Sequence, residues 1–165
     1  MALSVGTKAP DFILPTKTAD GPKQIRLSEN FSKGNTVLLF FPMAFTGTCT
    51  TEFCGVSMDM SAFGALMATV YGISGDNPFA QEAWAQKEGI TVRLLSDYEH
   101  KIAKAYDVMY DSFLPHLAKE DEIDRTINSS IRRFVSCQFT DLISVTWRYV
   151  PRCCSSAAVA SSMCH

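Results

Sequence analysis

The stretch Thr36–Cys54, TVLLFFPMAFTGTCTTEFC, carries the pattern that decides the fold of this chain. It begins with an unbroken apolar run, Val37 to Phe41, which is typical of a strand buried on both faces. Pro42 ends this run because proline cannot donate a hydrogen bond to a sheet ladder. Apolar residues then recur at steps of three and four from Phe53 to Met67, which indicates one face of a helix. The stretch therefore predicts a buried strand, a short loop and a helix.

Cys49 lies at the junction of this strand and helix. Unpaired backbone N–H groups and the positive end of the helix dipole point at such a position. Both favour thiolate over thiol, and such surroundings can lower a cysteine pKa from ~8.5 to roughly 3.5–7.5. The position predicts that Cys49 is a nucleophile. The alternative is a small buried hydrophobic residue, which is what a lone cysteine most often is.

Length and composition restrict the class of protein. A chain of 165 residues suits one domain with a single substantial core. The formal charge of −2 gives no electrostatic footprint for nucleic acid or an anionic membrane, and no apolar run approaches the ~20 residues of a membrane span. The start of the chain has no charged and apolar segments typical of a signal peptide. We therefore expect a cytoplasmic protein whose six cysteines are mostly reduced thiols.

Strand and helix signals alternate along the first two thirds of the chain. A second apolar strand is expected at Val70–Ser74, followed by a helix from Phe79 to Glu88 that Asp76 or Asn77 caps. A third strand at Ile90–Leu95 precedes a helix that Ser96 or Asp97 caps and that runs to about Tyr106. This alternation predicts an α/β layer structure with a central sheet.

Several segments, in order, resemble peroxiredoxins of the AhpC/TSA superfamily. The residues PMAFTGTC, Pro42 to Cys49, fit the pattern Pro-x-x-x-Thr-x-x-Cys around the reactive cysteine of that family. The stretches VGTKAPDFIL, VYGISGDNPF and LLSDYEHKIAKAYDV resemble its opening segment and its following strand–helix units. The resemblance covers about residues 4–117 and is strongest to the AhpE-like and bacterioferritin-comigratory branches. It implies a thioredoxin-like fold, α/β, with a central mixed sheet flanked by helices.

The resemblance also implies a reaction and its residues. Cys49 would attack a peroxide oxygen and become a sulfenic acid, while Thr46 holds the peroxide and Pro42 shields the thiolate from water. Alternatively, Thr46 is an N-cap or turn residue, and Pro42 is a strand terminator. Cys54, five residues after Cys49, resembles a resolving cysteine, with a core residue as the alternative. On an intact helix the two Cα atoms would be ~8–9 Å apart, and a disulfide needs less than ~7 Å, so the first turn would have to unwind.

The implied partners are a peroxide and a thiol reductant that is thioredoxin-like or glutaredoxin-like, with no metal, haem or flavin. No nucleic acid or membrane partner is expected. A homodimer is one candidate assembly. Glu52 is expected to serve as a capping-box partner or an acid in the first turn of the helix, and Trp84 as a packing residue.

The chain departs from the family pattern after about Leu117. Residues 131–150 are expected to form two strands around Thr140–Asp141, which suits the closing hairpin of the family, although the usual motif of that hairpin is missing. Peroxiredoxins use an arginine beside the thiolate; spacing selects Arg125 and analogy to the closing hairpin selects Arg132 or Arg133, so this role stays open. The domain is expected to span residues 1–150, with 118–150 atypical, and residues 151–165 to be an irregular, disordered tail. An altered reading frame is one hypothesis for this terminus, and comparison of the three coding frames would test it. The remaining cysteines are expected to be incidental thiols: Cys137, Cys153, Cys154 and Cys164.

Two other functions are compatible with parts of the sequence. A catalytically impaired thioredoxin-fold interaction or chaperone-like module would explain the irregular C-terminal third. A disulfide reductase is a weaker alternative, because that chemistry usually needs Cys-x-x-Cys and the chain has no such pair. A peroxide assay distinguishes both from a peroxidase.

Overall fold

A computed structural model describes residues 3–4, 6–109, 134–137 and 143–144. The candidate arginines 125, 132 and 133, the cysteines 153, 154 and 164, and the expected tail 151–165 lie outside the described residues. So do the transition at about Leu117 and the turn at Thr140–Asp141. For β6 and β7 only the backbone is described.

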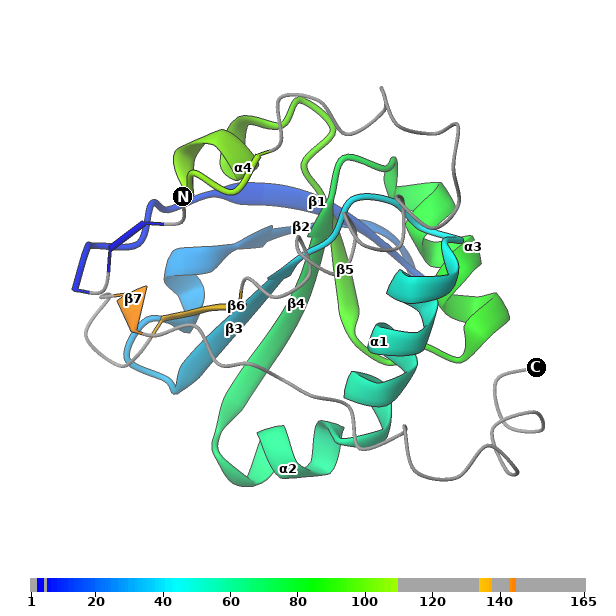
Figure 1. Ribbon diagram of the computed structural model, residues 1–165, viewed down its shortest axis with the longest axis horizontal. Helices are drawn as coiled ribbons and strands as arrows, with labels where there is room; N and C mark the ends of the chain where they lie inside the picture. Colours follow the sequence, from blue (N-terminus) through cyan, green and yellow to red (C-terminus); the bar gives the residue numbers. More distant parts are fainter. Residues whose placement is uncertain (1–2, 5, 110–133, 138–142, 145–165) are drawn as a thin grey trace.

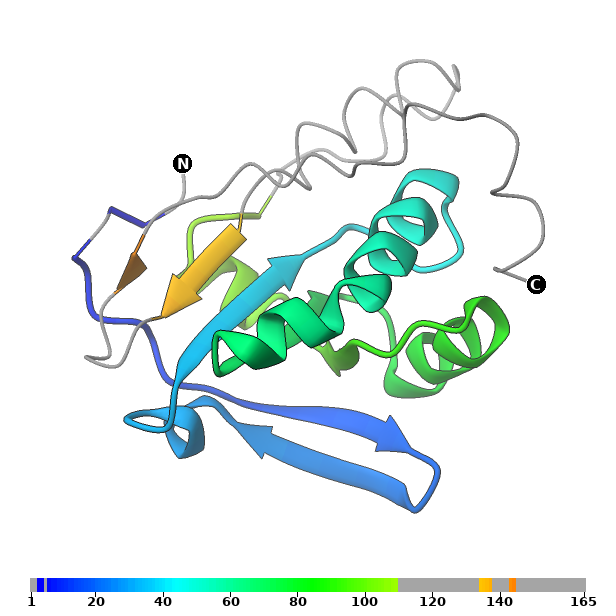
Figure 2. The same ribbon diagram turned by 90° about the horizontal axis from the view of Figure 1, so that it is seen from below.

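The described chain forms two sheets with helices packed around the larger one (Figure 1). Strands β1 (Ile13–Thr18) and β2 (Gly21–Arg26) form an antiparallel hairpin that Figure 2 shows apart from the main sheet. A 3-10 helix at Leu27–Asn30 follows. The main sheet has the order β5-β4-β3-β6-β7. Its strands are β3 (Asn35–Phe40), β4 (Ala68–Ser74), β5 (Arg93–Ser96), β6 (Phe134–Cys137) and β7 (Ile143–Ser144).

The main sheet is mixed, as the family resemblance implies. Strands β3, β4 and β5 run parallel, whereas β6 is antiparallel to β3 and β7 to β6. Leu39 of β3 lies opposite Phe134 of β6, so the chain enters β6 beside the carboxyl end of β3. The two closing strands expected around Thr140–Asp141 are therefore present as β6 and β7.

Four α-helices complete the described fold: α1 (Gly47–Met58), α2 (Met60–Ala65), α3 (Pro78–Glu88) and α4 (Lys101–Ala105). Helix α3 has the predicted ends: Asn77 accepts hydrogen bonds from the backbone N–H groups of Phe79 and Ala80, and Gly89 closes the helix at φ 67°. Helix α4 is shorter than predicted. A turn at Asp97–His100 precedes it, and the Asp97 carboxylate accepts from the N–H groups of Ile102 and Ala103.

The single helix predicted from Phe53 to Met67 is wrong, because the structure breaks it at Asp59. The periodic apolar pattern persists across this break, but Met67 is 64% exposed and lies at φ 49° in the turn before β4. Phe53 and Val56, in the first half of the pattern, are buried, whereas Met67, its last residue, is exposed. Apolar spacing alone carries no information about where the chain must turn to begin β4.

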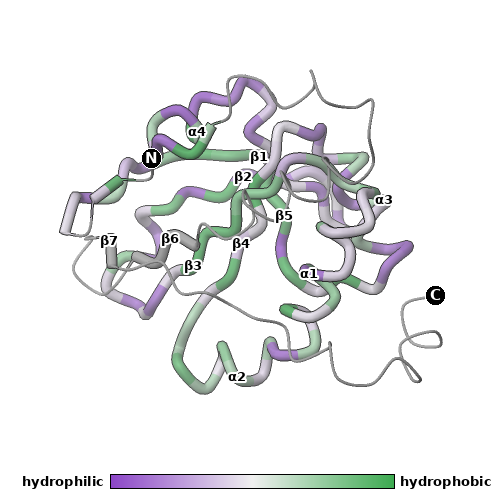
Figure 3. Tube along the Cα trace, in the orientation of Figure 1, coloured by the Kyte–Doolittle hydropathy of each residue, from purple (hydrophilic) through white to green (hydrophobic). Residues whose placement is uncertain are grey.

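Strand β3 is buried on both faces, as its apolar run predicts. Val37, Leu39 and Phe41 face the core cluster shared with α1 and α3. Leu38 and Phe40 face the second cluster, shared with β1 and α4. Figure 3 shows hydrophobic residues concentrated along the central strands. Because β3 has no solvent-facing side, the loop at its end is held by a core on each face.

Gly72 of β4 allows α1 to approach the sheet closely. A Cβ at this position would lie 2.5 Å from a ring carbon of Phe53 and 2.6 Å from a methyl group of Leu94. Phe53 thereby packs directly on β4, and α1 lies against the sheet with its N-terminus at the carboxyl end of β3.

Candidate active site

The loop between β3 and α1 and the first turn of α1 contain three of the four predicted site residues, and Thr46 and Cys49 are in contact. Phe41 donates its N–H to the Ile73 carbonyl at 3.0 Å, so the sheet ladder continues up to Pro42. Helix α1 begins at Gly47, with Thr46 at the N-cap, and Cys49 is its third residue. The N–H groups of a helix's first turn have no partner within the helix, and they point at this end. Cys49 therefore lies in the place that the strand–loop–helix pattern predicts.

Thr46 combines a capping position with a contact to the thiol. Its backbone is that of an N-cap, but its side chain makes no capping hydrogen bond. The hydroxyl donates instead to the Met43 carbonyl at 3.1 Å. The Thr46 side chain also makes a hydrogen bond with the Cys49 sulfur, which lowers the pKa of the thiol. The Thr46 hydroxyl therefore lies beside the Cys49 sulfur.

The pKa of Cys49 differs from the sequence prediction. Cys49 is fully buried, and burial raises its pKa from 9.0 to about 11, although hydrogen bonds from Thr46 and the Met43 backbone oppose the shift. Glu52 and Asp76 raise it further through their negative charge. A helix dipole contributes about 0.3–1 kcal/mol, less than one pKa unit. The dipole on which the prediction relied is therefore too weak to offset the burial of the sulfur.

Cys54 lies one and a half turns further along α1, and it too is buried. Both cysteines are reduced thiols. The Cys54 thiol donates to the Glu88 carbonyl of α3 at 3.5 Å. Because α1 is intact between the two residues, the structure represents the wound, reduced form and leaves the resolving role of Cys54 untested.

Glu52 is not the capping-box partner that the sequence predicts. The helix begins two residues before Cys49, so the third helical residue is Cys49 and no acid lies in the first turn. One carboxylate oxygen of Glu52 is buried with no hydrogen-bond partner, and burial raises the pKa of this carboxyl from 4.5 to about 7. Glu52 is instead a half-buried acid with one buried carboxylate oxygen, one turn from the thiol.

This raised pKa predicts a pH-dependent stability. Folded Glu52 keeps its proton up to about pH 7, whereas unfolded Glu52 loses it near 4.5, so its stabilising contribution is full below pH 4.5 and is lost as the pH rises through 7. Glu52→Gln should therefore raise the free energy of unfolding at pH 8 by about 1–3 kcal/mol more than at pH 4.5. Urea unfolding at both pH values measures this difference, with the exposed Glu29→Gln as control. An equal change at the two pH values would contradict the shift.

Asp76, which the sequence predicts only as a possible helix cap, supports the loop between β3 and α1. Its carboxylate accepts from the Ala44 N–H and the Ser74 hydroxyl, both at 2.8 Å. This bond ties the cysteine loop to the end of β4. The sequence could have indicated this contact. Asp76 follows β4 and the cysteine loop follows β3, and the carboxyl ends of neighbouring parallel strands meet at one edge of a sheet.

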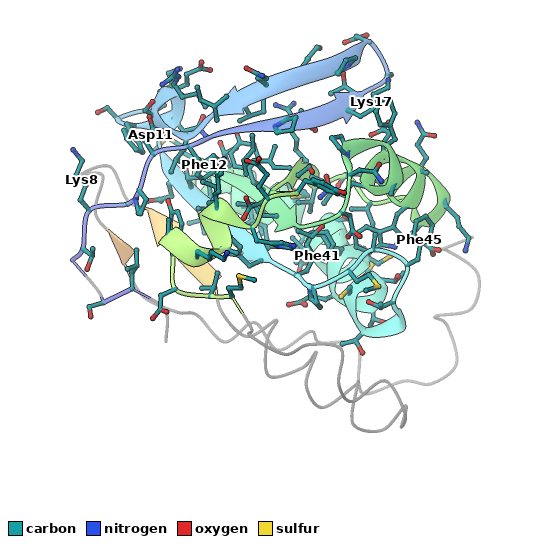
Figure 4. All side chains as sticks on the ribbon, turned by 90° about the horizontal axis from the view of Figure 1, so that it is seen from above. Lys8, Asp11, Phe12, Lys17, Phe41 and Phe45 are labelled. Carbon is teal, nitrogen blue, oxygen red and sulfur yellow. The ribbon has the colours of Figure 1, made fainter. Side chains whose placement is uncertain are left out.

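Phe41 and Phe45 differ although both belong to the same aromatic run. Phe41 packs among Phe53 and Trp84, with ring centroids 4.8 and 5.3 Å away. Phe45 is 53% exposed at φ 63°, and the Lys87 ammonium lies 6.0 Å from its ring centroid. Figure 4 shows Phe41 within the body of the domain and Phe45 at its periphery. Phe41 therefore packs in the core at the start of the loop, whereas Phe45 lies exposed on the loop itself.

Within the described residues, no helix is long and apolar enough to cross a membrane. The structure contains the strand–loop–cysteine–helix arrangement that the sequence predicts, with one hydroxyl beside the sulfur. Among the described residues, no positively charged group contributes to the pKa shift of the Cys49 thiol.

Known proteins share both the sequence and this architecture. The Bcp peroxiredoxin of Bacillus subtilis is 35% identical over 108 residues, 66% of each chain. The putative peroxiredoxin bcp of Coxiella burnetii is 37% identical over 112 residues, 67% of this chain and 71% of that one. The chloroplastic 2-cysteine peroxiredoxin of Chattonella marina is 35% identical over 116 residues, but the match spans only 60% of its length.

Solved structures confirm the thioredoxin-like fold. Peroxidoxin BcpB of Mycobacterium tuberculosis superposes with a TM-score of 0.61 at 32% identity, covering 67% of this chain and 70% of that one. Reduced 2-Cys peroxiredoxin of Plasmodium vivax gives 0.70 over 88% and 85% at 23% identity. The AhpC/TSA family model matches residues 5–127, which include β1 to α4 and the whole cysteine loop. By sequence, fold and the placement of Cys49, this chain belongs to the AhpC/TSA family.

Proposed function

We propose that this protein is a thiol-dependent peroxidase that reduces hydrogen peroxide or small organic hydroperoxides. The observation that carries this proposal is the position of Cys49 at the third residue of α1, with the Thr46 side chain hydrogen-bonded to its sulfur. The match spans 60% of the length of the Chattonella relative and 66% of the Bacillus relative, whose names identify them as peroxiredoxins.

The proposed reaction begins with attack of the Cys49 thiolate on one peroxide oxygen. The S–O bond forms as the O–O bond breaks, giving a sulfenic acid and a hydroxide or alkoxide. Negative charge develops on the leaving oxygen, and the N–H groups at the start of α1, which a helix does not use internally, are suitable donors for it. The Thr46 hydroxyl can accept and donate, so it can orient the peroxide against the sulfur. Pro42, half-buried at the end of β3, limits the access of water.

Reduction of the sulfenic acid completes the proposed cycle. Cys54 is the candidate resolving thiol, and a thioredoxin-like or glutaredoxin-like protein would then reduce the disulfide. The reducing compartment that this cycle needs is the cytoplasm, and a homodimer is the candidate assembly. The donor set around Cys49 requires no metal, haem or flavin for this chemistry.

Addition of peroxide to the reduced full chain tests the proposal. We expect rapid loss of peroxide in stoichiometric amount, a gain of one oxygen at Cys49 detected with a sulfenic-acid trap, and catalytic turnover when a thiol reductant is added. Mass analysis without reductant then shows whether Cys54 pairs with Cys49. A sulfenic acid that persists beside unoxidised Cys54 would assign resolution to an external thiol. No peroxide loss and no sulfenic product would favour the interaction module instead.

A further inference from the structure

Three hydrogen bonds join one face of α1 to α3 and the segment after it. The Trp84 indole N–H donates to the Thr50 hydroxyl at 3.1 Å. The Cys54 thiol donates to the Glu88 carbonyl at 3.5 Å, and the Thr91 N–H donates to the Ser57 hydroxyl at 3.0 Å. Thr50, Cys54 and Ser57 are spaced i, i+4 and i+7, so they lie on one face of the helix. We call these three residues and their bonds the polar seam.

The first bond of the seam has a rigid donor. Trp84 is fully buried, and its ring packs 5.3 Å from Phe41 and 5.5 Å from Phe53, centroid to centroid. The indole N–H therefore has a fixed direction, toward the residue next to Cys49. If the first turn of α1 moves away, this buried donor loses its acceptor, which costs more than an exposed bond does.

Opening of this turn is required for chemistry at the sulfur beyond the peroxide step. Cys49 has no exposed surface, so neither Cys54 nor an external thiol can reach it while α1 is wound. The two Cα atoms are ~8–9 Å apart on such a helix, beyond the ~7 Å limit of a disulfide. Cys54 must also leave the Glu88 carbonyl. The Trp84–Thr50 and Cys54–Glu88 bonds of the seam must therefore break before the disulfide can form.

We propose that Thr50 is a positioning residue for Cys49, and that release of the polar seam limits the rate of Cys49–Cys54 disulfide formation. This inference rests on the proposed function for its physiological oxidant. In that cycle the sulfenic acid of Cys49 and the thiol of Cys54 condense to a disulfide and one water. While the seam holds, the sulfenic acid stays in the wound turn, where a second peroxide can oxidise it to sulfinic acid.

The experiment compares two valines at adjacent positions of α1 in the reduced full chain. Thr50→Val removes the acceptor of the Trp84 bond, whereas Thr51→Val removes only an exposed hydroxyl that donates to the Gly47 carbonyl within α1. Thr50→Ser restores an acceptor. Disulfide formation is driven by an azodicarboxamide, whose N=N bond takes up the two thiol hydrogens, so no peroxidase activity is needed. Peptide mapping follows the Cys49–Cys54 bond, and hydrogen exchange follows the amides of residues 48–54.

We expect Thr50→Val to form the disulfide and to exchange these amides about tenfold faster than the unmodified chain. Thr51→Val should remain within about twofold, and Thr50→Ser should restore the slower rates. With excess peroxide, Thr50→Val should also accumulate less sulfinic acid. Equal rates for the two valine variants, or no rescue by serine, would overturn the inference. If Thr50→Val does not fold, Ser57→Ala tests the far end of the seam with the same readouts. Failure of the unmodified chain to consume peroxide would refute the proposed function alone.

Discussion

Cys49→Ser is expected to abolish peroxide consumption, because a serine hydroxyl at this position cannot take the place of a thiolate nucleophile. The rest of the site should remain, since Cys49 is a small buried residue and serine differs by one atom. We expect the rate constant for peroxide to fall to the background of the other five thiols, a loss of at least several thousand-fold. Stopped-flow measurement with limiting peroxide gives this number directly.

Cys54→Ser is the matched control on the same helix. Its hydroxyl can still donate to the Glu88 carbonyl, so α1 keeps its contact with α3. If Cys54 resolves, this variant should consume one equivalent of peroxide at the unmodified rate and then stop at the sulfenic acid. Equal peroxide consumption by Cys49→Ser and the unmodified chain would remove Cys49 from the mechanism.

Replacing one of the candidate arginines is expected to cause the second largest loss of reactivity with peroxide. A thiol with a pKa of about 11 is ionised to only about one part in ten thousand at pH 7. The acids Glu52 and Asp76 make ionisation harder, and the helix dipole is too weak to compensate. A peroxidase therefore needs a cation that the described residues do not bring to the sulfur. Arg125, Arg132 and Arg133 are the candidates that the sequence offers.

Single substitutions to methionine distinguish these candidates. Spacing selects Arg125, whereas analogy to the closing hairpin selects Arg132 or Arg133, so each is replaced separately. Replacing the arginine that acts should raise the Cys49 pKa and slow the reaction with peroxide about 100-fold, from loss of a charge-assisted hydrogen bond. Thiolate absorbance against pH measures the pKa. Arg26→Met, which removes an arginine 3.7 Å from Asp11, is the control.

Two outcomes would contradict the role of an arginine at Cys49. If all three methionine variants keep the pKa and the rate of the unmodified chain, none of these arginines acts on Cys49. If the unmodified chain also titrates near pH 11, the site lacks its cation and the impaired interaction module becomes the better description.

The sequence by itself determined the elements around the site and the position of Cys49 between them. An apolar run with a proline at its end is typical of a buried strand that stops there, and Asn77-Pro78 with Gly89 marks both ends of α3 by local backbone chemistry. These signals act within a few residues, so they survive without knowledge of the fold. The family motif from Pro42 to Cys49 is local for the same reason.

Only the tertiary structure decided the electrostatics of the site and its supports. The pKa of Cys49 depends on how completely the fold removes water from the sulfur, and the carboxylate of Asp76 reaches Ala44 across 32 residues of chain. The bond from Trp84 to Thr50 spans 34 residues. Burial and hydrogen bonds between distant segments depend on packing, and no periodicity in a single segment encodes which partner will lie opposite it.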